Sequence, residues 1–204
     1  MKQYPTMSGK ILRNIDIYAF DKLDGSNIRA EWSRKRGFYK FGSRKRLLGS
    51  DQESIVDAQD IIIEKYERDL TKIFKEQGWE RVICFFEFYG DNSFAGQHEN
   101  ELHDVILLDV NPYKKGIMLP QDFIHTFSWV HTPKLLYYGK ANVDFESEVR
   151  KGLLHGMTFE GVVCKGPLDK KKKMVTMFKI KSHAWLNKLR EHCGENDKLF
   201  EVMK

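Results

Sequence analysis

The chain has 204 residues, 31% of them charged, and its lysines and arginines outnumber its acids by 34 to 29. This length suits one large domain or two small ones with a full core. A net charge of +5 is a modest excess that favours an anionic partner without requiring one. The first ten residues are polar and no apolar run approaches a membrane span, so neither a signal peptide nor a transmembrane helix is expected.

The cysteines indicate the compartment. Cys84, Cys164 and Cys193 are far apart, odd in number and without the Cys-x-x-Cys spacing of a zinc site. Cys84 and Cys164 lie inside apolar runs, which is typical of buried thiols in a reducing environment. The pair His192-Cys193 lacks a second ligand pair at matching spacing, so it does not predict zinc. A cytoplasmic protein is the simplest interpretation.

Strand-like alternation fills the beginning of the chain. Segments rich in β-formers alternate between apolar and polar residues and end at turn residues. The predicted strands cover residues 15–20, 27–32 and 38–42. A helix is predicted next, because the apolar residues of 53–77 recur at helical spacing opposite a charged face. Ser50 or Asp51 can cap this helix, and Gly78 can end it.

Further strands and helices fill the remainder of the chain. Continuous apolar runs predict central strands, and strand-like and helix-like segments follow them. The predicted strands cover 81–89, 103–110, 134–138, 158–165 and 174–180. The predicted helices cover 120–129, 143–154 and 183–193, and a short polar tail follows Gly194. Because the sequence contains no repeat or low-complexity linker, it predicts a single α+β domain over residues 1–204.

Basic residues gather at 34–36, 44–46 and 170–173. The first two clusters flank an aromatic segment that contains Phe38, Tyr39 and Phe41. A mixture of cations and aromatic rings suits a nucleic-acid backbone better than a solvated loop. The third cluster is equally well interpreted as an exposed turn.

Lys22 is the most informative residue of the chain. It ends an apolar strand-like segment and is followed by Leu23-Asp24-Gly25-Ser26-Asn27. A lysine fixed in a turn can act as a nucleophile that forms a covalent intermediate, provided that its amine can lose its proton. The same pattern is typical of a hairpin in which Asp-Gly supplies the bend. Lys22 alone therefore leaves both interpretations open.

Further segments place charges within or beside strands. In chain order they are Phe41-Gly42-Ser43-Arg44, Phe85-Phe86-Glu87-Phe88-Tyr89-Gly90, Glu160-Gly161-Val162-Val163-Cys164-Lys165 and Phe178-Lys179-Ile180-Lys181. A charge on a core strand is costly unless it is paired or faces a polar site. Lys179 and Lys181 share a strand face because side chains alternate, so both can address one anion. Each segment alone is also explained by an edge strand with solvated charges.

Taken together and in this order, the segments resemble the covalent nucleotidyltransferase superfamily of ATP-dependent polynucleotide ligases and GTP-dependent mRNA capping enzymes. The resemblance extends from Lys22 to Lys181. Ser26 and Asn27 look like the RNA ligase branch, which contains RNA-editing ligases and phage ligases that seal duplex RNA. The resemblance implies an ATP-grasp-like ligase domain of antiparallel sheets flanked by helices, without the OB-fold domain that DNA ligases and capping enzymes append.

The resemblance also implies a three-step reaction. Lys22 would attack the α-phosphorus of ATP and form lysyl-AMP, AMP would pass to the 5′-phosphate of an RNA, and a 3′-hydroxyl would displace it. Such phosphoryl transfers depend on positioning and charge neutralisation. Free lysine has a pKa of about 10.4, so Lys22 needs neighbouring cations or burial to become a better nucleophile. Lys179, Lys181 and a bound Mg²⁺ or Mn²⁺ are expected to supply that positive surrounding.

Roles for other residues follow from the same resemblance. Glu160 would bind the metal directly or through water, and Glu87 would bind either the metal or the ribose hydroxyls. Arg44 and Lys165 would contact phosphates, and Asn27 would lie near the nucleotide or the 3′ end. The implied nucleotide-binding set is Asp21, Leu23, Asn27, Arg44, Glu87, Glu160, Lys165, Lys179 and Lys181.

Two departures from the family pattern stand out. Phe86 takes the place of a glycine before Glu87, where it is expected to narrow the ribose side of the pocket. The strand that ends at Asp109 contains no aromatic residue to stack on the purine. Aliphatic packing can substitute for that ring, at some cost in purine affinity.

Two alternatives remain open at this level. A minimal DNA ligase would share the motifs, because phosphate contacts carry no information about the sugar. A nucleotide- or nucleic-acid-binding module without turnover would explain the two departures. The presence of Lys22, Glu160, Lys179 and Lys181 argues against that module, since a protein without activity would not need all four.

Overall fold

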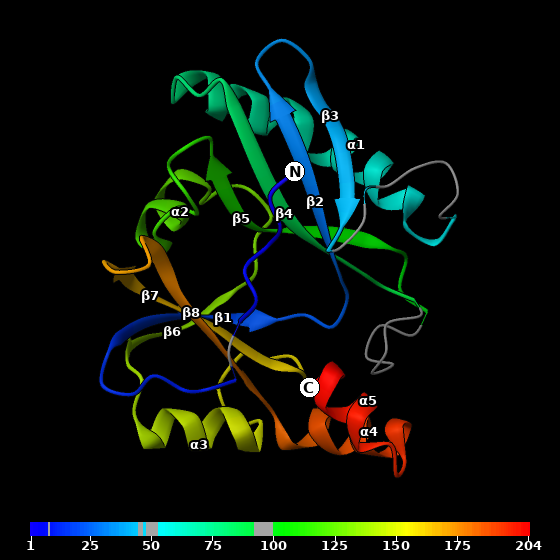
Figure 1. Ribbon diagram of the computed structural model, residues 1–204, viewed down its shortest axis with the longest axis vertical. Helices are drawn as coiled ribbons and strands as arrows, with labels where there is room; N and C mark the ends of the chain where they lie inside the picture. The colour runs from blue at the N-terminus through cyan, green and yellow to red at the C-terminus, as the bar shows by residue number, and fades with distance from the viewer. Residues whose placement is uncertain (8, 45–46, 48–52, 92–99) are drawn as a thin grey trace.

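A computed structural model describes residues 1–7, 9–44, 47, 53–91 and 100–204. These residues form two four-stranded antiparallel sheets flanked by five helices, which confirms the predicted α+β class. The first sheet has the strand order β6-β1-β7-β8, and the second sheet has the order β3-β2-β4-β5. Figure 1 shows the second sheet in the upper part of the molecule and the first sheet below it. No helix in the described ranges has the length and apolar content needed to cross a membrane.

The predicted elements are present, with ends that shift by up to a few residues. The strands are β1 (Asp16–Lys22), β2 (Ser26–Ser33), β3 (Gly37–Ser43), β4 (Arg81–Tyr89), β5 (Asp104–Pro112), β6 (Leu135–Lys140), β7 (Gly161–Asp169) and β8 (Met174–Lys181). The helices are α1 (Glu53–Glu76), α2 (Pro120–Thr126), α3 (Val143–Lys151), α4 (His183–Cys193) and α5 (Asp197–Met203).

One face of the second sheet packs against α1. Side-chain alternation along β2 turns Ile28, Ala30 and Trp32 toward this helix, and all three are fully buried. Trp32 meets the Phe74 ring of α1 edge-on at 5.1 Å, and its indole N–H donates to the Thr71 hydroxyl at 2.8 Å. Burying apolar side chains of this size stabilises the fold by roughly 1.5–3 kcal/mol each. The opposite face of the sheet stays open for polar residues.

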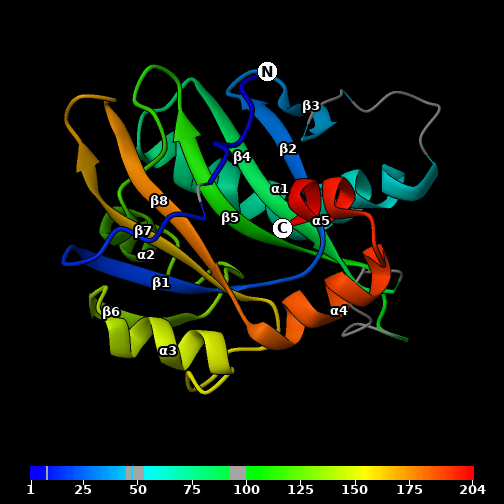
Figure 2. The same ribbon diagram turned by 60° about the horizontal axis from the view of Figure 1, so that its bottom comes forward.

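The first sheet packs against α3 in the same way. Ile17 and Ala19 of β1 are fully buried with Phe145 and Val149 of α3. Alternation then places Lys22 on the sheet face that α3 does not cover. Figure 2 shows α4 and α5 continuing from the end of β8.

The hairpin interpretation of Lys22 and the following residues is wrong. β1 pairs with β6 and β7, whereas β2 pairs with β3 and β4, so the residues between β1 and β2 cross from the first sheet to the second. Gly25 makes this crossing possible, because a Cβ at this position would lie 2.3 Å from the carbonyl oxygen of Phe88. Only glycine allows so close an approach of two backbones.

The expected polar tail after Gly194 is instead the helix α5. The Asn196 side chain caps it by accepting from the Leu199 N–H at 3.0 Å, and Phe200 is buried against α4 beside Trp185. An asparagine cap and one aromatic residue in a seven-residue segment form too short a pattern to indicate a helix in the sequence.

Two other helices end earlier than predicted. α2 ends at Thr126, and α3 ends at Lys151, where Gly152 adopts a left-handed backbone with φ 73°. That conformation is the usual stop for a helix. Ser50 and Asp51, the predicted caps of α1, lie outside the described residues, as do Lys45 and Arg46 of the second basic cluster.

Candidate active site

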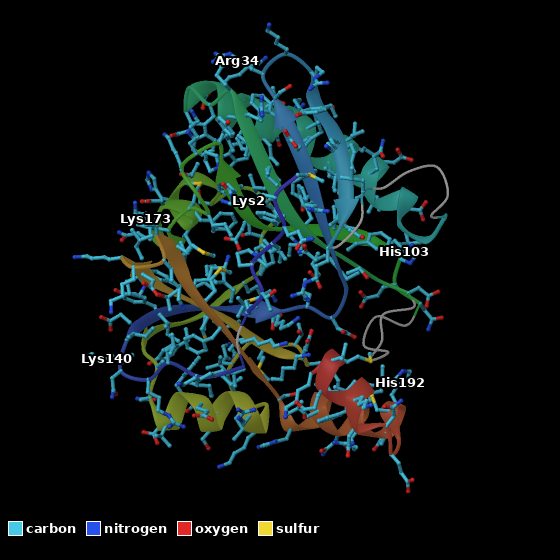
Figure 3. The ribbon with its side chains drawn as sticks, in the orientation of Figure 1. Lys2, Arg34, His103, Lys140, Lys173 and His192 are labelled. Atoms are coloured by element: carbon cyan, nitrogen blue, oxygen red, sulfur yellow. The ribbon has the colours of Figure 1, made fainter. Side chains whose placement is uncertain are left out.

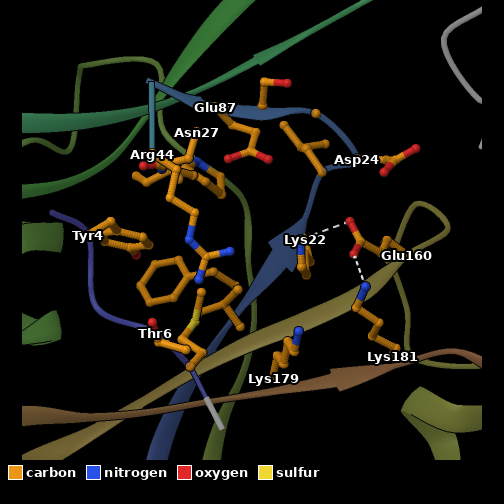
Figure 4. Close-up of a pocket in the computed structure, with 18 of the residues that line it drawn as sticks. Tyr4, Thr6, Lys22, Asp24, Asn27, Arg44, Glu87, Glu160, Lys179 and Lys181 are labelled. Atoms are coloured by element: carbon orange, nitrogen blue, oxygen red, sulfur yellow. Dashed lines mark hydrogen bonds and ion pairs between the residues drawn. The ribbon is translucent and has the colours of Figure 1, made fainter. Parts of the chain in front are cut away.

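A cavity of about 970 Å³ is lined by residues of both sheets, of the N-terminal segment and of the C-terminal helices. Figure 4 shows a close-up of it. The structure brings all the candidate residues predicted from the sequence to its wall. They are Asp21, Lys22, Leu23, Asn27, Arg44, Glu87, Glu160, Lys165, Lys179 and Lys181.

Lys22 and Lys181 share one carboxylate. The Lys22 Nζ lies 2.8 Å from one oxygen of Glu160, and the Lys181 Nζ lies 2.9 Å from the other (Figure 4). The Glu160 and Lys181 side chains are 3% and 7% exposed, whereas the Lys22 side chain is 18% exposed. Lys22 is therefore the member of this trio that a ligand in the cavity reaches most easily.

A close strand pair holds Glu160 in place. Gly161 follows it at the start of β7, opposite Lys181, with a φ of 138°. A Cβ on Gly161 would lie 2.1 Å from the Ile180 carbonyl oxygen. Lys22 also pairs with Gly161, so one row across the first sheet contains Lys22, Gly161 and Lys181. The register of β1, β7 and β8 therefore brings Lys22, Glu160 and Lys181 together.

Lys179 and Lys181 add positive charge to the same wall. Both line the cavity, as their alternation on β8 predicts. Burial lowers the pKa of Lys179, and Lys22 lowers it further. Burial also lowers the pKa of Lys181 to about 8, against the opposing effect of Glu160. Burial thus disfavours the charged forms of both lysines, and an anion bound between them would stabilise those forms.

Two carboxylates control the protonation of Lys22. Burial would lower the pKa of Lys22, but the charges of Glu160 and Glu87 outweigh it and leave that pKa raised. Burial raises the pKa of Glu87 to about 7, although the Lys22 charge opposes the rise. Lys22 is therefore an ammonium group in the ligand-free cavity and has to lose a proton before it can act as a nucleophile.

The second sheet contributes three further polar residues. Asn27 of β2 lies opposite Glu87 of β4, and its Nδ2 donates to the Phe86 carbonyl at 3.2 Å. Its Oδ1 is buried and accepts no hydrogen bond from the described residues, a state that proteins usually avoid unless a ligand or water completes it. Arg44, just beyond β3, extends into the cavity between Tyr4 and Lys22 (Figure 4).

Asp21 and Leu23, which flank the lysine, have different surroundings. Asp21 is buried and accepts from the backbone N–H of Thr158 at 3.0 Å and from its hydroxyl at 3.2 Å. Burial raises the pKa of Asp21, and these hydrogen bonds work against the rise. Asp21 thereby holds the segment that leads to Glu160, whereas Leu23 adds an apolar side chain to the cavity wall.

Lys165 joins the two sheets beneath the cavity. Its Nζ lies 2.7 Å from an Asp109 oxygen and donates to the Leu108 carbonyl at 2.8 Å. The Tyr4 hydroxyl donates to the other oxygen of Asp109. The same Nζ lies 4.7 Å from the Phe20 ring centre and 5.1 Å from that of Phe123, so rings surround the part of the ammonium group that these bonds leave.

The expectation that Phe86 narrows the ribose side of the pocket is wrong. Phe86 is fully buried in the core, with its ring 5.1 Å from Tyr66 and 6.4 Å from Phe38. Alternation along β4 turns Phe86 toward α1 and Glu87 toward the cavity.

Sequence reasoning missed two aromatic residues of the cavity, Tyr4 and Trp185. The Tyr4 ring packs 4.8 Å from Phe85, and the Trp185 ring lies 3.3 Å from the Lys181 Nζ. Neither has a local signal in the sequence, because each reaches the cavity from a segment outside the five motifs. They provide aromatic surface that β5 lacks.

The donor set fits a divalent cation that is held partly by substrate. Among the described residues, no three His, Cys, Asp or Glu side chains gather into a metal cluster. Mg²⁺ usually keeps several waters and binds one or two carboxylates together with substrate phosphates. Glu160, with Glu87 also in the cavity wall, supplies carboxylates of this kind.

No family model and no curated protein sequence matches this chain. Solved structures of an RNA ligase from Naegleria gruberi match its fold. A variant of that ligase with ATP and Mn covers 92% of this chain and 58% of its own, with a TM-score of 0.65 and 16% identity. The ligase with PPi covers 88% and 53%, with a TM-score of 0.61 and 16% identity. This chain therefore shares the fold of the matched part of that RNA ligase, and it spans between half and three fifths of those ligase chains.

Proposed function

We propose that this chain is an ATP-dependent RNA ligase that joins 5′-phosphate and 3′-hydroxyl ends through a lysyl-AMP intermediate at Lys22. One observation carries the proposal: Lys22 ends β1 in a large cavity, with its amine bonded to Glu160 and with Lys179 and Lys181 on the same wall. The fold shared with an RNA ligase that was solved with ATP and Mn supports it.

The first step would be attack of the Lys22 amine on the α-phosphorus of ATP. A nitrogen–phosphorus bond forms, the bond to pyrophosphate breaks, and the two protons that the Lys22 ammonium group loses pass to solvent. Lys179 and Lys181 would neutralise the phosphate oxygens, where preorganised charge contributes most to phosphoryl transfer. Both lysines also oppose the ammonium form of Lys22 once Glu160 turns to another partner.

The remaining wall would hold the nucleotide and its phosphates. The free Oδ1 of Asn27 and the carboxyl group of Glu87 can accept from ribose hydroxyls. Arg44 would donate to phosphate oxygens, and Lys165 in the cavity wall would add positive charge near them. Asp21 would hold the segment that leads to Glu160, and Leu23 would pack against the nucleotide.

Glu160 would help to hold Mg²⁺ or Mn²⁺ together with the phosphates of ATP. Such a cation supplies charge stabilisation at the phosphoryl oxygens. While Glu160 holds the metal, it would no longer pair with Lys22, whose ammonium form this carboxylate otherwise favours. Glu160 thus links metal binding to activation of the nucleophile.

The intact mass of the protein after incubation with ATP and Mg²⁺ tests the covalent step. The wild type is expected to gain one AMP moiety, and Lys22→Ala is expected to gain none. Lys151→Ala, an exposed lysine on α3, is the matched control and should behave as the wild type. An adduct on Lys22→Ala would show that another residue is the nucleophile. No adduct on any variant would favour a binding module without turnover.

Nicked duplexes test the polynucleotide. All-RNA and all-DNA nicks of one sequence should be compared, because phosphate contacts do not distinguish the sugars. Faster sealing of RNA is expected. Equal or faster sealing of DNA would replace the RNA assignment with that of a minimal DNA ligase.

A further inference from the structure

The face of the second sheet opposite α1 continues beyond the cavity and ends in a cluster of cations and aromatic rings. We call this cluster the basic–aromatic surface, and it comprises Arg36, Tyr39, Arg81, Tyr113 and Lys114. Its residues come from the β2–β3 turn, from β3, from the start of β4 and from the residues after β5, which meet at one end of the sheet (Figure 1). None of them lines the cavity.

Each ring of this surface has a cation over it. The Arg36 guanidinium lies 3.7 Å from the Tyr39 ring centre, and Arg81 lies 5.0 Å from that of Tyr113. The Lys114 Nζ lies 5.4 Å from the same Tyr113 ring. Ser33 of β2 pairs with Gly37 on one side and with Arg81 on the other, so the turn that contains Arg36 lies beside the start of β4. The Tyr113 N–H in turn donates to the Arg81 carbonyl at 2.9 Å. The five residues therefore form one cluster.

Strand register decides which aromatic residue faces outward. Glu31 pairs with Lys40 and Trp32 with Phe38, so Tyr39 is the extra residue of a β-bulge. A bulge of this kind redirects a side chain. Phe38, in contrast, is buried in the core, as is the neighbouring Phe41. Of the three aromatic residues between the first two basic clusters, Tyr39 alone belongs to the surface.

The cations of the surface are not neutralised by neighbouring acids. In the ranges that the structure describes, no ion pair joins Arg36, Arg81 or Lys114 to a carboxylate. Glu31 accepts from the Tyr39 hydroxyl instead, and the exposed Glu80 pairs with Arg34 at 3.0 Å. Exposed arginines beside aromatic rings are the chemistry that binds nucleic-acid backbones and stacked bases.

The surface also lies at a useful distance from the cavity. Glu87 follows Arg81 by six positions along β4, which corresponds to about 20 Å of extended strand. The Met1 carbonyl accepts a hydrogen bond from Arg29, which lies on the same face of the second sheet. The neighbouring Lys2 is exposed there. Figure 3 shows Lys2 between Arg34 and the lower part of the molecule.

We propose that the basic–aromatic surface is an RNA-binding site, at which Arg36, Arg81 and Lys114 contact backbone phosphates and Tyr113 stacks on a base or sugar. It would hold one arm of the RNA about 20 Å along β4 from Glu87 in the cavity wall. This assignment rests on the proposed ligase function and identifies how the chain grips its polynucleotide.

Binding of a nicked RNA duplex at several salt concentrations tests the phosphate contacts. The variant Arg36→Ala/Arg81→Ala/Lys114→Ala is expected to bind at least tenfold more weakly than the wild type. The slope of log K against log salt should become shallower by about 0.9 for each phosphate that the variant no longer neutralises. The control Arg68→Ala/Lys72→Ala/Lys151→Ala removes equal charge from exposed positions on α1 and α3 and should change affinity less than twofold. Equal weakening in both variants would overturn the proposal.

The length of the RNA duplex on either side of the nick provides a second test of where the RNA is bound. With duplex arms too short to span about 20 Å, the surface variant should bind as the wild type does. Equal weakening with short and long arms would place the effect at the cavity and refute the assignment. Adenylation by ATP is measured in parallel and should be unchanged in the surface variant. Failure of the wild type to form the adduct would refute the ligase function, whereas the binding comparison reports on the surface alone.

Substitution of Tyr113 isolates the stacking contribution. Tyr113→Ala is expected to weaken RNA binding severalfold without changing the salt slope, because no charge is removed. Tyr113→Phe keeps the ring and should bind as the wild type. If Tyr113→Ala also bound as the wild type, the ring would have no part in RNA binding.

Discussion

At the scale of single residues, the cavity shifts the pKa of a lysine and of a carboxyl group. Glu160 and Glu87 keep Lys22 charged, while burial holds Glu87 at a pKa of about 7. The raised pKa of Glu87 means that ionisation of this carboxyl group lowers the stability of the folded protein, and shifts of this kind are concentrated at functional sites. The loss of stability on ionisation of Glu87 can be measured by unfolding the protein without a ligand.

Glu87→Gln is expected to stabilise the protein at high pH. The folded-state pKa of Glu87, about 7, lies above its ordinary value of 4.5, so the wild type loses stability as the pH rises from about 4.5 through 7. Gln carries no charge and escapes this loss, which amounts to roughly 3 kcal/mol at most. Urea unfolding of both proteins between pH 4.5 and 8.5 measures the difference. A difference that does not change with pH would show that burial does not shift the Glu87 pKa.

At the scale of elements, two glycines let strands approach closely enough to build the site. Gly25 permits the crossing between the sheets, and Gly161 permits the close pairing of β7 with β8 beside Glu160. The motifs of the sequence identify these positions but not their purpose. The hairpin interpretation failed because Asp-Gly is compatible both with a hairpin turn and with a chain that crosses between two sheets, so these residues alone do not distinguish the two.

Gly161→Ala is expected to destabilise the protein and to displace Glu160. The added Cβ would lie 2.1 Å from the Ile180 carbonyl oxygen, at a φ that alanine rarely adopts. A cost of about 1–3 kcal/mol is typical of such strain, and urea unfolding measures it. Formation of the AMP adduct should fall as well, since Lys22 loses its aligned neighbour.

Gly9→Ala is the control for this substitution. A Cβ at Gly9 meets no atom within 4 Å. Its free energy of unfolding should match that of the wild type. If Gly161→Ala behaved like Gly9→Ala, the close pairing of β7 and β8 would not be needed to place Glu160.

At the scale of the whole molecule, one buried network connects the two sheets. Lys165 of the first sheet pairs with Asp109 of the second, and Tyr4 of the N-terminal segment donates to the same carboxylate. The Lys165 and Asp109 side chains are 4% and 1% exposed, so removal of either charge leaves the other buried without compensation. The network sets how the walls of the cavity face each other.

Lys165→Met is expected to lower the free energy of unfolding by about 3–5 kcal/mol, because it leaves the Asp109 carboxylate unpaired. The double variant Lys165→Met/Asp109→Asn should recover part of this loss, since Asn can still accept from Tyr4. Chemical denaturation of the four members of this cycle measures the coupling.

The exposed pair of Arg34 and Glu80, 3.0 Å apart, is the control cycle for this measurement. Its coupling should stay below about 1 kcal/mol, because water screens exposed ion pairs. A coupling between Lys165 and Asp109 as small as that value would show that the network does not hold the sheets together.

The sequence by itself determined the elements and the candidate chemistry. Alternation and helical spacing predicted the strands and the long helix, and the resemblance to covalent nucleotidyltransferases made Glu87, Glu160, Lys179 and Lys181 candidate site residues. These signals are local, because a helix or strand that buries one face repeats its apolar residues at a fixed spacing along the sequence. A tail too short for a periodic pattern, such as α5, was missed.

Only the tertiary structure decided which groups meet. The shared carboxylate of Lys22 and Lys181, the Lys165–Asp109 link and the aromatic surface of Tyr4 and Trp185 all join segments that lie far apart in the chain. Strand order and register place such segments together, and neither leaves a periodic signal in the residues themselves. The same reason explains why Phe86 faces the core and Tyr39 faces the solvent: the pairing partner of each strand decides its faces.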